Sequence, residues 1–251
     1  MRFDIVTLFP DMMRAVLEES ILGRAAEKGI LEFFYTNIRD FAENKHKKVD
    51  DYAYGGGTGL VMAPQPIVSA HESIPKQGRS LTIYLSPQGK VLTQQLAKEL
   101  VAYDQLILLC GHYEGVDERA IEAVVDVEVS IGDYVLTGGE IPAMALIDCV
   151  ARMVDGVLPS SDAYSKDSHY NGLLEYPQYT RPPEFRGRAV PEILLSGHHA
   201  NIEAWQRKQS LYRTWKKRPD LLRRADLDEA DKAYLALYKG KRRKKGGFLD
   251  G

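Results

Sequence analysis

Short apolar runs alternate with amphipathic segments along the first 156 residues of the chain. Residues 3–9, 81–85 and 105–110 are mostly apolar and lack a helical stripe, so each run predicts a buried strand. Shorter runs at residues 31–36 and 125–129 predict two further strands. The continuous apolar stretch at 105–110 is typical of a sheet that is covered on both faces.

Helical patterns lie between these strands. After Pro10, apolar residues recur at helical spacing and predict a single helix. Thr93 and Asp117 are N-cap candidates for two more helices, and Pro142 opens a longer one. This alternation predicts an α/β domain over residues 1–158, with a mainly parallel sheet and helices on both faces.

Three glycine-containing loops follow predicted strands, at residues 86–89, 111–115 and 131–139. In parallel sheets ligands bind outside the carboxyl ends of the strands. Glycine also lets a backbone approach a ligand closely. The three loops therefore predict a backbone-lined pocket for a small ligand. A further glycine-rich stretch at residues 55–59 matches neither the dinucleotide fingerprint nor the P-loop.

The composition changes after residue 158. Residues 159–172 are rich in Ser, Asp and Tyr, and they predict an interdomain linker that becomes ordered only with a partner or ligand. Helical patterns at residues 201–212 and 227–238 predict a small, mostly helical domain over residues 173–251. The basic run at residues 239–247 predicts a mobile tail. The expected core anchors of this domain are Trp205, Leu211, Tyr212 and Trp215.

Charge is unevenly distributed along the chain. Residues 200–251 contain 15 Lys and Arg against 7 Asp and Glu, a net charge of +8. Because the whole chain has a net charge of −2, residues 1–199 carry −10. Such asymmetry predicts a region that binds a polyanion on an otherwise acidic body, and a solvated basic tail is the alternative.

Composition excludes several classes of protein. The fractions of hydrophobic residues, 44%, and charged residues, 27%, are those of an ordinary globular protein. No apolar stretch is long enough to span a membrane, and the opening residues lack the basic leader of a signal peptide. Two cysteines are too few for a disulfide framework. These observations predict a cytoplasmic protein without a membrane segment.

Familiar catalytic patterns are absent from the sequence. It contains no nucleophile elbow, no P-loop and no pair of histidines at metal-binding spacing. His198 and His199 are adjacent, and adjacent side chains point in different directions, so they rarely bind one ion together. The residue pattern by itself leaves the metal ligands unassigned.

A series of longer motifs carries a specific resemblance. The motifs are, in order, YGGGTGLVM at residues 54–62, YLSPQG at 84–89, CGHYEGVDER at 110–119, SIGDYVLTGGE at 130–140, KDS at 166–168, YTRP at 179–182 and LLSGHH at 194–199. Together they closely resemble the bacterial tRNA (guanine-N1)-methyltransferases, which modify guanine 37 beside the anticodon. The resemblance implies the SPOUT class, with a deep trefoil knot in the sheet and a homodimer whose active site is composite.

The resemblance also implies the cofactors. S-adenosylmethionine is the methyl donor of this family, and magnesium is required for activity, although no carboxylate cluster here indicates its ligands. One departure concerns His112, where some relatives have arginine, so a fixed positive charge there is in doubt. By matching motifs, the residues expected to bind the methyl donor are Tyr84, Leu85, Ser86, Pro87, Gly111, Tyr113, Glu114, Gly115, Ser130, Ile131, Gly132, Asp133, Tyr134, Val135, Leu136, Gly138, Gly139 and Pro142.

Two residues are implied to carry the chemistry. Guanine N1 holds a proton, so its methylation needs a base, together with a cation or donor that stabilises charge developing at O6. The matching motifs place Asp167 as the base and Arg152 as the stabilising cation. The basic residues 207, 208, 213, 216, 217 and 218 would bind tRNA phosphates, and His46, Arg181, Arg186 and Arg188 would add contacts. Two alternatives stay open, namely an RNA-binding module without activity and methylation of a ribose 2′-hydroxyl.

Overall fold

The computed structural model describes residues 1–56, 59–160 and 162–238. Contacts divide the chain into two units, Met1–Ser161 and Asp162–Gly251. Each unit has its own helices and strands, which are given below for the described residues. The expected division into a cofactor domain, a linker and a tRNA-binding domain stays a prediction.

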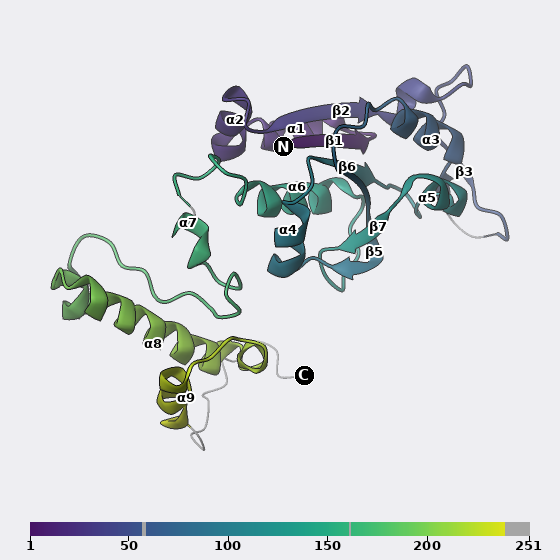
Figure 1. The fold of residues 1–251 in the computed structure, drawn as a ribbon. Coiled ribbons are helices and arrows are strands. Elements are labelled where there is room, and N and C mark those ends of the chain that lie inside the picture. Colours follow the sequence, from purple (N-terminus) through teal and green to yellow (C-terminus); the bar gives the residue numbers. More distant parts are fainter. Residues whose placement is uncertain (57–58, 161, 239–251) are drawn as a thin grey trace. The chain divides into compact units, whose positions relative to one another are not determined.

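A five-stranded sheet organises the first unit. The strand order is β2-β1-β6-β5-β7, and every neighbouring pair is parallel (Figure 1). Every residue of β1 and β6 is buried, which explains their continuous apolar sequences and confirms the predicted parallel sheet. The strands are β1 Arg2–Thr7, β2 Glu32–Asn37, β5 Ser80–Val91, β6 Gln105–Cys110 and β7 Val127–Ser130.

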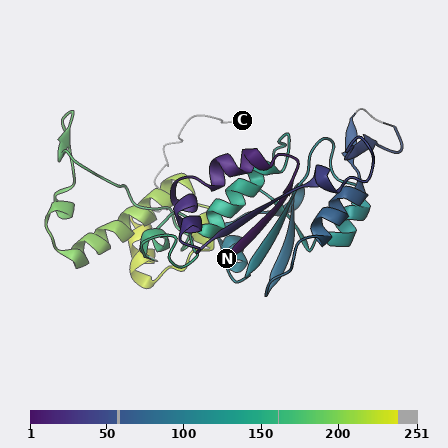
Figure 2. The same ribbon diagram turned by 90° about the horizontal axis from the view of Figure 1, so that it is seen from above.

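Helices cover both faces of this sheet. Figure 2 shows α1 and α6 on one side of the strands and α3 and α5 together on the other. A small antiparallel hairpin, β3 Asp50–Tyr52 with β4 Leu60–Met62, lies in the polar stretch for which the sequence predicted no regular element. The helices are α1 Pro10–Leu17, α2 Ser20–Glu27, η1 Ile38–Phe41, α3 Pro64–Glu72, α4 Gln94–Leu100, α5 Glu118–Val124 and α6 Glu140–Ala151.

The two predicted N-caps are confirmed. The Thr93 hydroxyl accepts a hydrogen bond from the backbone N–H of Leu96 at 3.2 Å, at the start of α4. The Asp117 carboxylate accepts one from the backbone N–H of Arg119 at 3.0 Å, at the start of α5. Each side chain thus satisfies an N–H that has no partner inside its helix.

Three predicted element boundaries are wrong. The single helix expected after Pro10 is two helices, because Ser20 adopts a positive φ of 57° and redirects the chain. Helix α6 begins at Glu140 rather than Pro142, since the first turn needs no intrahelical N–H donors and tolerates proline. The turn expected after Leu85 is an irregularity within β5, where the pairing with β7 shifts register before Lys90.

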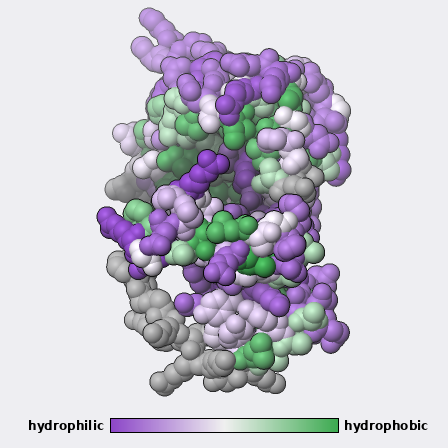
Figure 3. All heavy atoms as spheres, turned by 90° about the vertical axis from the view of Figure 1, so that its left-hand side faces the viewer, coloured by the Kyte–Doolittle hydropathy of each residue, from purple (hydrophilic) through white to green (hydrophobic). Residues whose placement is uncertain are grey.

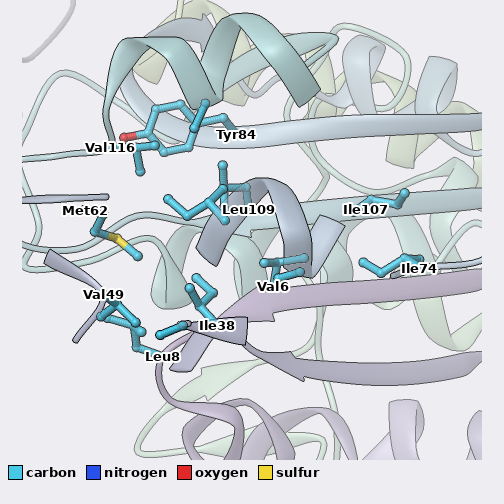
Figure 4. Packing of buried hydrophobic residues seen from close by; sticks show 14 residues of the cluster. Val6, Leu8, Ile38, Val49, Met62, Ile74, Tyr84, Ile107, Leu109 and Val116 are labelled. Carbon is cyan, nitrogen blue, oxygen red and sulfur yellow. The ribbon is translucent and has the colours of Figure 1, made fainter. Parts of the chain in front are cut away.

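The core of the first unit supports the carboxyl end of the sheet. Val6 of β1, together with Ile107 and Leu109 of β6, packs against buried residues of α3 and β4, including Ile67 and Met62 (Figure 4). These side chains are almost completely buried. The irregular part of β5 and the loops that leave β6 and β7 therefore start from a rigid base.

The second unit is mostly helical. Leu211 is buried, whereas the other three expected anchors are half-buried and make contacts between aromatic rings. The ring centroid of Tyr212 lies 5.9 Å from that of Trp215 and 5.2 Å from that of Tyr238, and the ring centroids of Trp205 and Tyr179 are 6.5 Å apart. No helix of the described residues is long and apolar enough to cross a membrane. The predicted tail at residues 239–247 lies outside the described residues. The elements are α7 Asp162–Ser165, β8 Glu184–Phe185, β9 Arg188–Ala189, η2 Glu192–Leu195, α8 His199–Lys217, η3 Leu221–Arg223 and α9 Glu229–Ala236.

Candidate functional site

A cavity of about 250 Å³ lies at the carboxyl edge of the sheet. It is enclosed by the irregular part of β5, by the loops after β6 and β7, and by residues of α5, β7 and the start of α6. These strands are neighbours in the sheet and run parallel, so their carboxyl ends meet at one edge. The structure thus brings together the three segments that the sequence predicted as the walls of one pocket, although the first of them, residues 86–89, lies within β5 and not in a loop after it.

Nearly all of the residues expected to bind the methyl donor line this cavity. The exception is Asp133, which lies in the loop after β7 but is not among the lining residues. Eight further residues line the cavity without having been predicted from the sequence; five of them lie inside the quoted motifs, which was the available signal, and the other three lie on α5 and β7. These additional residues are Gln88, His112, Val116, Glu118, Ile121, Glu128, Val129 and Thr137.

Close backbone packing explains two of the glycines. The N–H of Gly139 donates to the carbonyl of Gly111 at 2.8 Å, which joins the loop after β7 to the loop after β6. A Cβ atom at Gly139 would lie 2.8 Å from the Cα of Cys110. A Cβ at Gly111 would lie 2.9 Å from the ring of Tyr84. Because real side chains do not pack this closely, glycine is required at both positions.

Backbone conformation explains other residues of the loops. Gly115 and Gly132 have φ values of 133° and 147°, which are strained for any other residue, and Tyr113 has a φ of 61°. The Ser130 hydroxyl accepts a hydrogen bond from the N–H of Gly132 at 3.1 Å and donates to its carbonyl at 3.0 Å. These local bonds hold the loop after β7 in its turn.

The β3–β4 hairpin supports the loop after β6. The N–H of Glu114 donates to the carbonyl of Leu60 at 3.0 Å, and the N–H of Met62 donates to the carbonyl of Gly115 at 2.9 Å. The side chain of Glu114 lies against Gly59, where a Cβ would come within 2.5 Å of it. The YGGGTGLVM motif therefore has a structural role beside the cavity, although residues 57 and 58 lie outside the described part of the chain.

A buried carboxylate ties the loops to the end of β1. Glu140 is only 2% exposed and accepts a hydrogen bond from the Thr7 hydroxyl at 2.7 Å. Its other oxygen lies 3.4 Å from Nε2 of His112, whose ring packs on Phe9 with centroids 4.8 Å apart. Burial, and the charge of Glu140, raise the pKa of the Cys110 thiol. A buried carboxylate needs such partners, so this network fixes the base of the cavity.

The lining combines apolar and acidic groups. Leu85 and Leu136 offer apolar surface, while Glu114, Glu118 and Glu128 contribute carboxylates. Burial raises the pKa of Tyr84, so its phenol stays neutral and can donate hydrogen bonds. Such a cavity suits a ligand that has both a flat apolar ring system and a positive charge.

Comparisons with known proteins identify the family. The model of the family described as tRNA (Guanine-1)-methyltransferase TrmD matches residues 1–224. The chain belongs to this family. A tRNA (guanine-N(1)-)-methyltransferase of Ruminiclostridium cellulolyticum is 59% identical over 223 residues, which cover 88% of this chain and 96% of that protein. Two proteins of the same name are each 54% identical to this chain. The alignment with the protein of Clostridium botulinum strain 657 covers 96% of this chain and 100% of that protein, and the alignment with the protein of Alkaliphilus oremlandii covers 95% of this chain and 98% of that protein.

The two residues implied to carry the methyltransferase chemistry belong to different units. Arg152 is the C-cap of α6 in the first unit, and its N–H donates to the carbonyl of Asp148 at 3.3 Å. Asp167 follows α7 in the second unit, where its N–H donates to the carbonyl of Tyr164 at 3.1 Å and its carbonyl accepts from the N–H of Tyr170 at 3.2 Å. The catalytic roles of both residues stay predictions.

Asp167 lines a second cavity, of about 200 Å³, within the second unit. Asn171 and Leu173 of the same segment line it too, and α8 contributes Gln206 and Arg207. The side-chain amide of Asn171 donates to the carbonyl of Ser165 at 2.7 Å and stabilises the turn that carries Asp167. Asp167 therefore lies on the wall of a cavity that its own segment and α8 enclose.

Two of the basic residues expected to bind phosphates have partners in the second unit. Arg207 donates to the buried carboxylate of Asp231 at 2.5 Å and 3.2 Å, and Arg218 binds Asp220 at 2.7 Å. Burial of Asp231 makes the first pair a structural contact between α8 and the start of α9. The phosphate-binding role predicted for the basic residues of α8 therefore rests mainly on those other than Arg207 and Arg218.

Metal ligands stay unassigned. Among the residues that the structure describes, no group of three or more His, Cys, Asp or Glu side chains could hold a metal ion. The donor set thus does not indicate a magnesium site, and no step of the chemistry is assigned to one.

Proposed function

We propose that this chain transfers the methyl group of S-adenosylmethionine to N1 of guanine 37 in tRNA. One observation carries the proposal: three glycine loops whose motifs resemble the donor-binding loops of the family enclose a single cavity. The chain matches that family over residues 1–224. S-adenosylmethionine supplies the methyl group. The residues of the chain bind S-adenosylmethionine and remove the proton from guanine N1.

The lining of the cavity supports donor binding. Backbone groups of the glycine loops can hydrogen-bond the adenine, and Leu85 and Leu136 can cover its faces. The carboxylates of Glu114, Glu118 and Glu128 suit the positive sulfonium and ammonium groups. The donor-binding roles of the motif residues belong to this proposal, including that of Asp133.

Proton removal is assigned to Asp167. Its carboxylate accepts the proton of guanine N1, which makes that nitrogen a nucleophile. Arg152 then stabilises the negative charge that develops at guanine O6. A base is needed because a neutral N1–H has no lone pair available for the methyl group.

Assembly as a homodimer with a composite active site is part of the proposal. Exposed apolar side chains on α1 and α2, including Met12, Val16 and Ile21, form a surface that a second copy could cover. Figure 3 shows the face that lies on the left-hand side of Figure 1, on which green hydrophobic residues lie between purple hydrophilic ones. The hydrogen bond from Gly139 to Gly111 is compatible with a knotted chain, which is also part of the proposal.

Nucleoside analysis tests the reaction. The protein is incubated with labelled S-adenosylmethionine, magnesium and an unmodified tRNA transcript, and label is expected in 1-methylguanosine. A transcript with adenine at position 37 should accept no label. Label in a ribose 2′-O-methyl group, or none at all, would overturn the proposal in favour of the two alternative functions.

The role of Asp167 has a separate test. Asp167→Asn keeps the size of the side chain but is a much weaker base, and we expect turnover to fall by about 10²-fold to 10⁴-fold. Donor affinity, measured by calorimetry, should change little in this variant and in Asp167→Ala. Turnover like that of the wild type in both variants would show that another group removes the proton.

A further inference from the structure

A compact loop at residues 166–175, the Asp167 loop, folds back on itself in the second unit. The backbone N–H of His169 donates to the carbonyl of Leu173 at 2.7 Å, and the N–H of Gly172 donates to the carbonyl of His169 at 3.3 Å. Two positive φ angles, 74° at His169 and 75° at Gly172, reverse the chain between these bonds. Leu173 is only 5% exposed, so the far side of the loop is packed into the unit.

One side chain of α8 anchors this loop. Thr214 is completely buried, and its hydroxyl accepts a hydrogen bond from the backbone N–H of Leu174 at 2.9 Å, across 40 residues of sequence. The same hydroxyl donates to the carbonyl of Ser210, one turn earlier in α8, at 2.7 Å. A hydroxyl has one proton, so this donation leaves its oxygen as the acceptor for the loop.

The anchor lies close to the part of the loop that carries the carboxylate. Asp167 and Ser210 line the same cavity of about 200 Å³. The N–H of Glu175 donates to the hydroxyl of Ser168 at 2.9 Å, which joins the anchored end of the loop to the residue next to Asp167. A shift of the loop on α8 would therefore move Asp167 with it. A misplacement of about 1 Å can lower the rate of a reaction by ~10²-fold.

We propose that Thr214 is a positioning residue for the methyl transfer, because its hydroxyl fixes the Asp167 loop on α8 and so fixes the place of the general base. This inference rests on the proposed function, since that function makes Asp167 the base. The alternative is a hydroxyl that serves α8 alone. Bonds from a threonine to the carbonyl four residues earlier slightly destabilise a helix, so the bond to Leu174 is the better reason for a buried hydroxyl at this position.

Single-turnover methylation tests the role of Thr214. Thr214→Val keeps the shape of the side chain but removes both hydrogen bonds, whereas Thr214→Ser keeps the hydroxyl. With the full chain, S-adenosylmethionine and a tRNA transcript, we expect the rate of methyl transfer to fall by about 10-fold to 100-fold in Thr214→Val. In Thr214→Ser the rate should stay within about threefold of the wild type, and in both variants the affinities for S-adenosylmethionine and tRNA should change by less than about threefold.

A double-mutant cycle with Asp167→Asn separates positioning from a structural role. If Thr214 acts through the base, adding Thr214→Val to Asp167→Asn should lower the rate by less than about twofold beyond Asp167→Asn alone. A structural role predicts that the two losses multiply, and full multiplication would overturn the inference. A wild-type rate in Thr214→Val would overturn it as well, as would a Thr214→Ser variant that is as slow as Thr214→Val.

Tyr234→Phe is the matched control, because it also removes one hydroxyl from the second unit. The hydroxyl oxygens of Tyr234 and Tyr238 lie 3.1 Å apart, on and just after α9. The rate of methyl transfer in this variant should equal that of the wild type. A loss as large as that of Thr214→Val would show that the rate follows the stability of the unit, and it would refute the positioning role.

Hydrogen exchange gives a measurement that needs no activity. The backbone amides of residues 168–175 should exchange at least about tenfold faster in Thr214→Val than in the wild type, and Thr214→Ser should protect them. Unchanged exchange in Thr214→Val would overturn the inference. A wild type that does not methylate guanine N1, or an Asp167→Asn variant as fast as the wild type, would instead refute the proposed function, so the two failures are distinguishable.

Discussion

Gly139→Ala tests whether close packing of the loops creates the cavity that we propose binds the methyl donor. Gly139 has a φ of −82° and a ψ of −6°, which alanine adopts without strain, so the substitution adds only the volume of one methyl group. That methyl would lie 2.8 Å from the Cα of Cys110 and 3.0 Å from the nitrogen of Gly111. Ordinary contacts between carbon atoms are about 3.5–4.0 Å, so the two loops must separate by roughly 1 Å.

The separation has two energetic consequences. It breaks the 2.8 Å hydrogen bond from Gly139 to Gly111, which contributes about 1 kcal/mol. Overpacking of this kind costs a further ~1–3 kcal/mol. The total of about 2–4 kcal/mol, at 1.4 kcal/mol per tenfold change, predicts binding of S-adenosylmethionine that is roughly 30-fold to 700-fold weaker.

Calorimetric titration with S-adenosylmethionine measures this loss, and thermal unfolding shows how much of it appears as lower stability. Gly187→Ala is the matched control. Gly187 has a positive φ of 72° and no atom near its missing Cβ, so alanine there costs about 1–2 kcal/mol of stability and should leave donor affinity unchanged. A dissociation constant within threefold of the wild type, at an unchanged melting temperature, would refute the role of the glycine contact.

Two further predictions concern buried polar groups of the first unit. Glu140→Ala leaves the Thr7 hydroxyl and His112 without their partner, so it should lower the free energy of unfolding by about 1–3 kcal/mol in urea denaturation. Glu140→Gln keeps the acceptor for the Thr7 hydroxyl and should lower the free energy of unfolding less. Equal stability of both variants and the wild type would contradict this network of contacts. Burial, and then the charge of Lys76, lower the pKa of His71, so its neutral form is favoured in the folded state. The stability that depends on neutral His71 is therefore complete above the ordinary histidine pKa of about 6.5 and is lost as the pH falls below it. The melting temperature of the wild type should fall more steeply between about pH 7 and pH 5 than that of His71→Leu, and parallel curves would show that His71 does not titrate in this way.

Local patterns were sufficient for most of the first unit. Continuous apolar runs predicted β1 and β6 because both strands are buried on two faces, and Thr93 and Asp117 marked helix starts because their side chains replace missing backbone partners. The same patterns failed at Ser20, where one residue with positive φ divides an otherwise continuous helical stripe. Periodicity reports which face of a helix is apolar, and it does not report where the backbone turns.

The three glycine-containing segments of the site, at residues 86–89, 111–115 and 131–139, show the same division between what the sequence and the structure decide. Their glycines and their order along the chain were sufficient, by the sequence alone, to predict a ligand pocket at one edge of a parallel sheet, and the longer motifs indicated the family. Only the tertiary structure decided how the walls are joined. Gly139 lies against Cys110 and Gly111, and Glu140 binds Thr7 from 133 residues earlier in the chain. Such contacts depend on strand order and close packing between distant segments, which no local pattern of residues encodes.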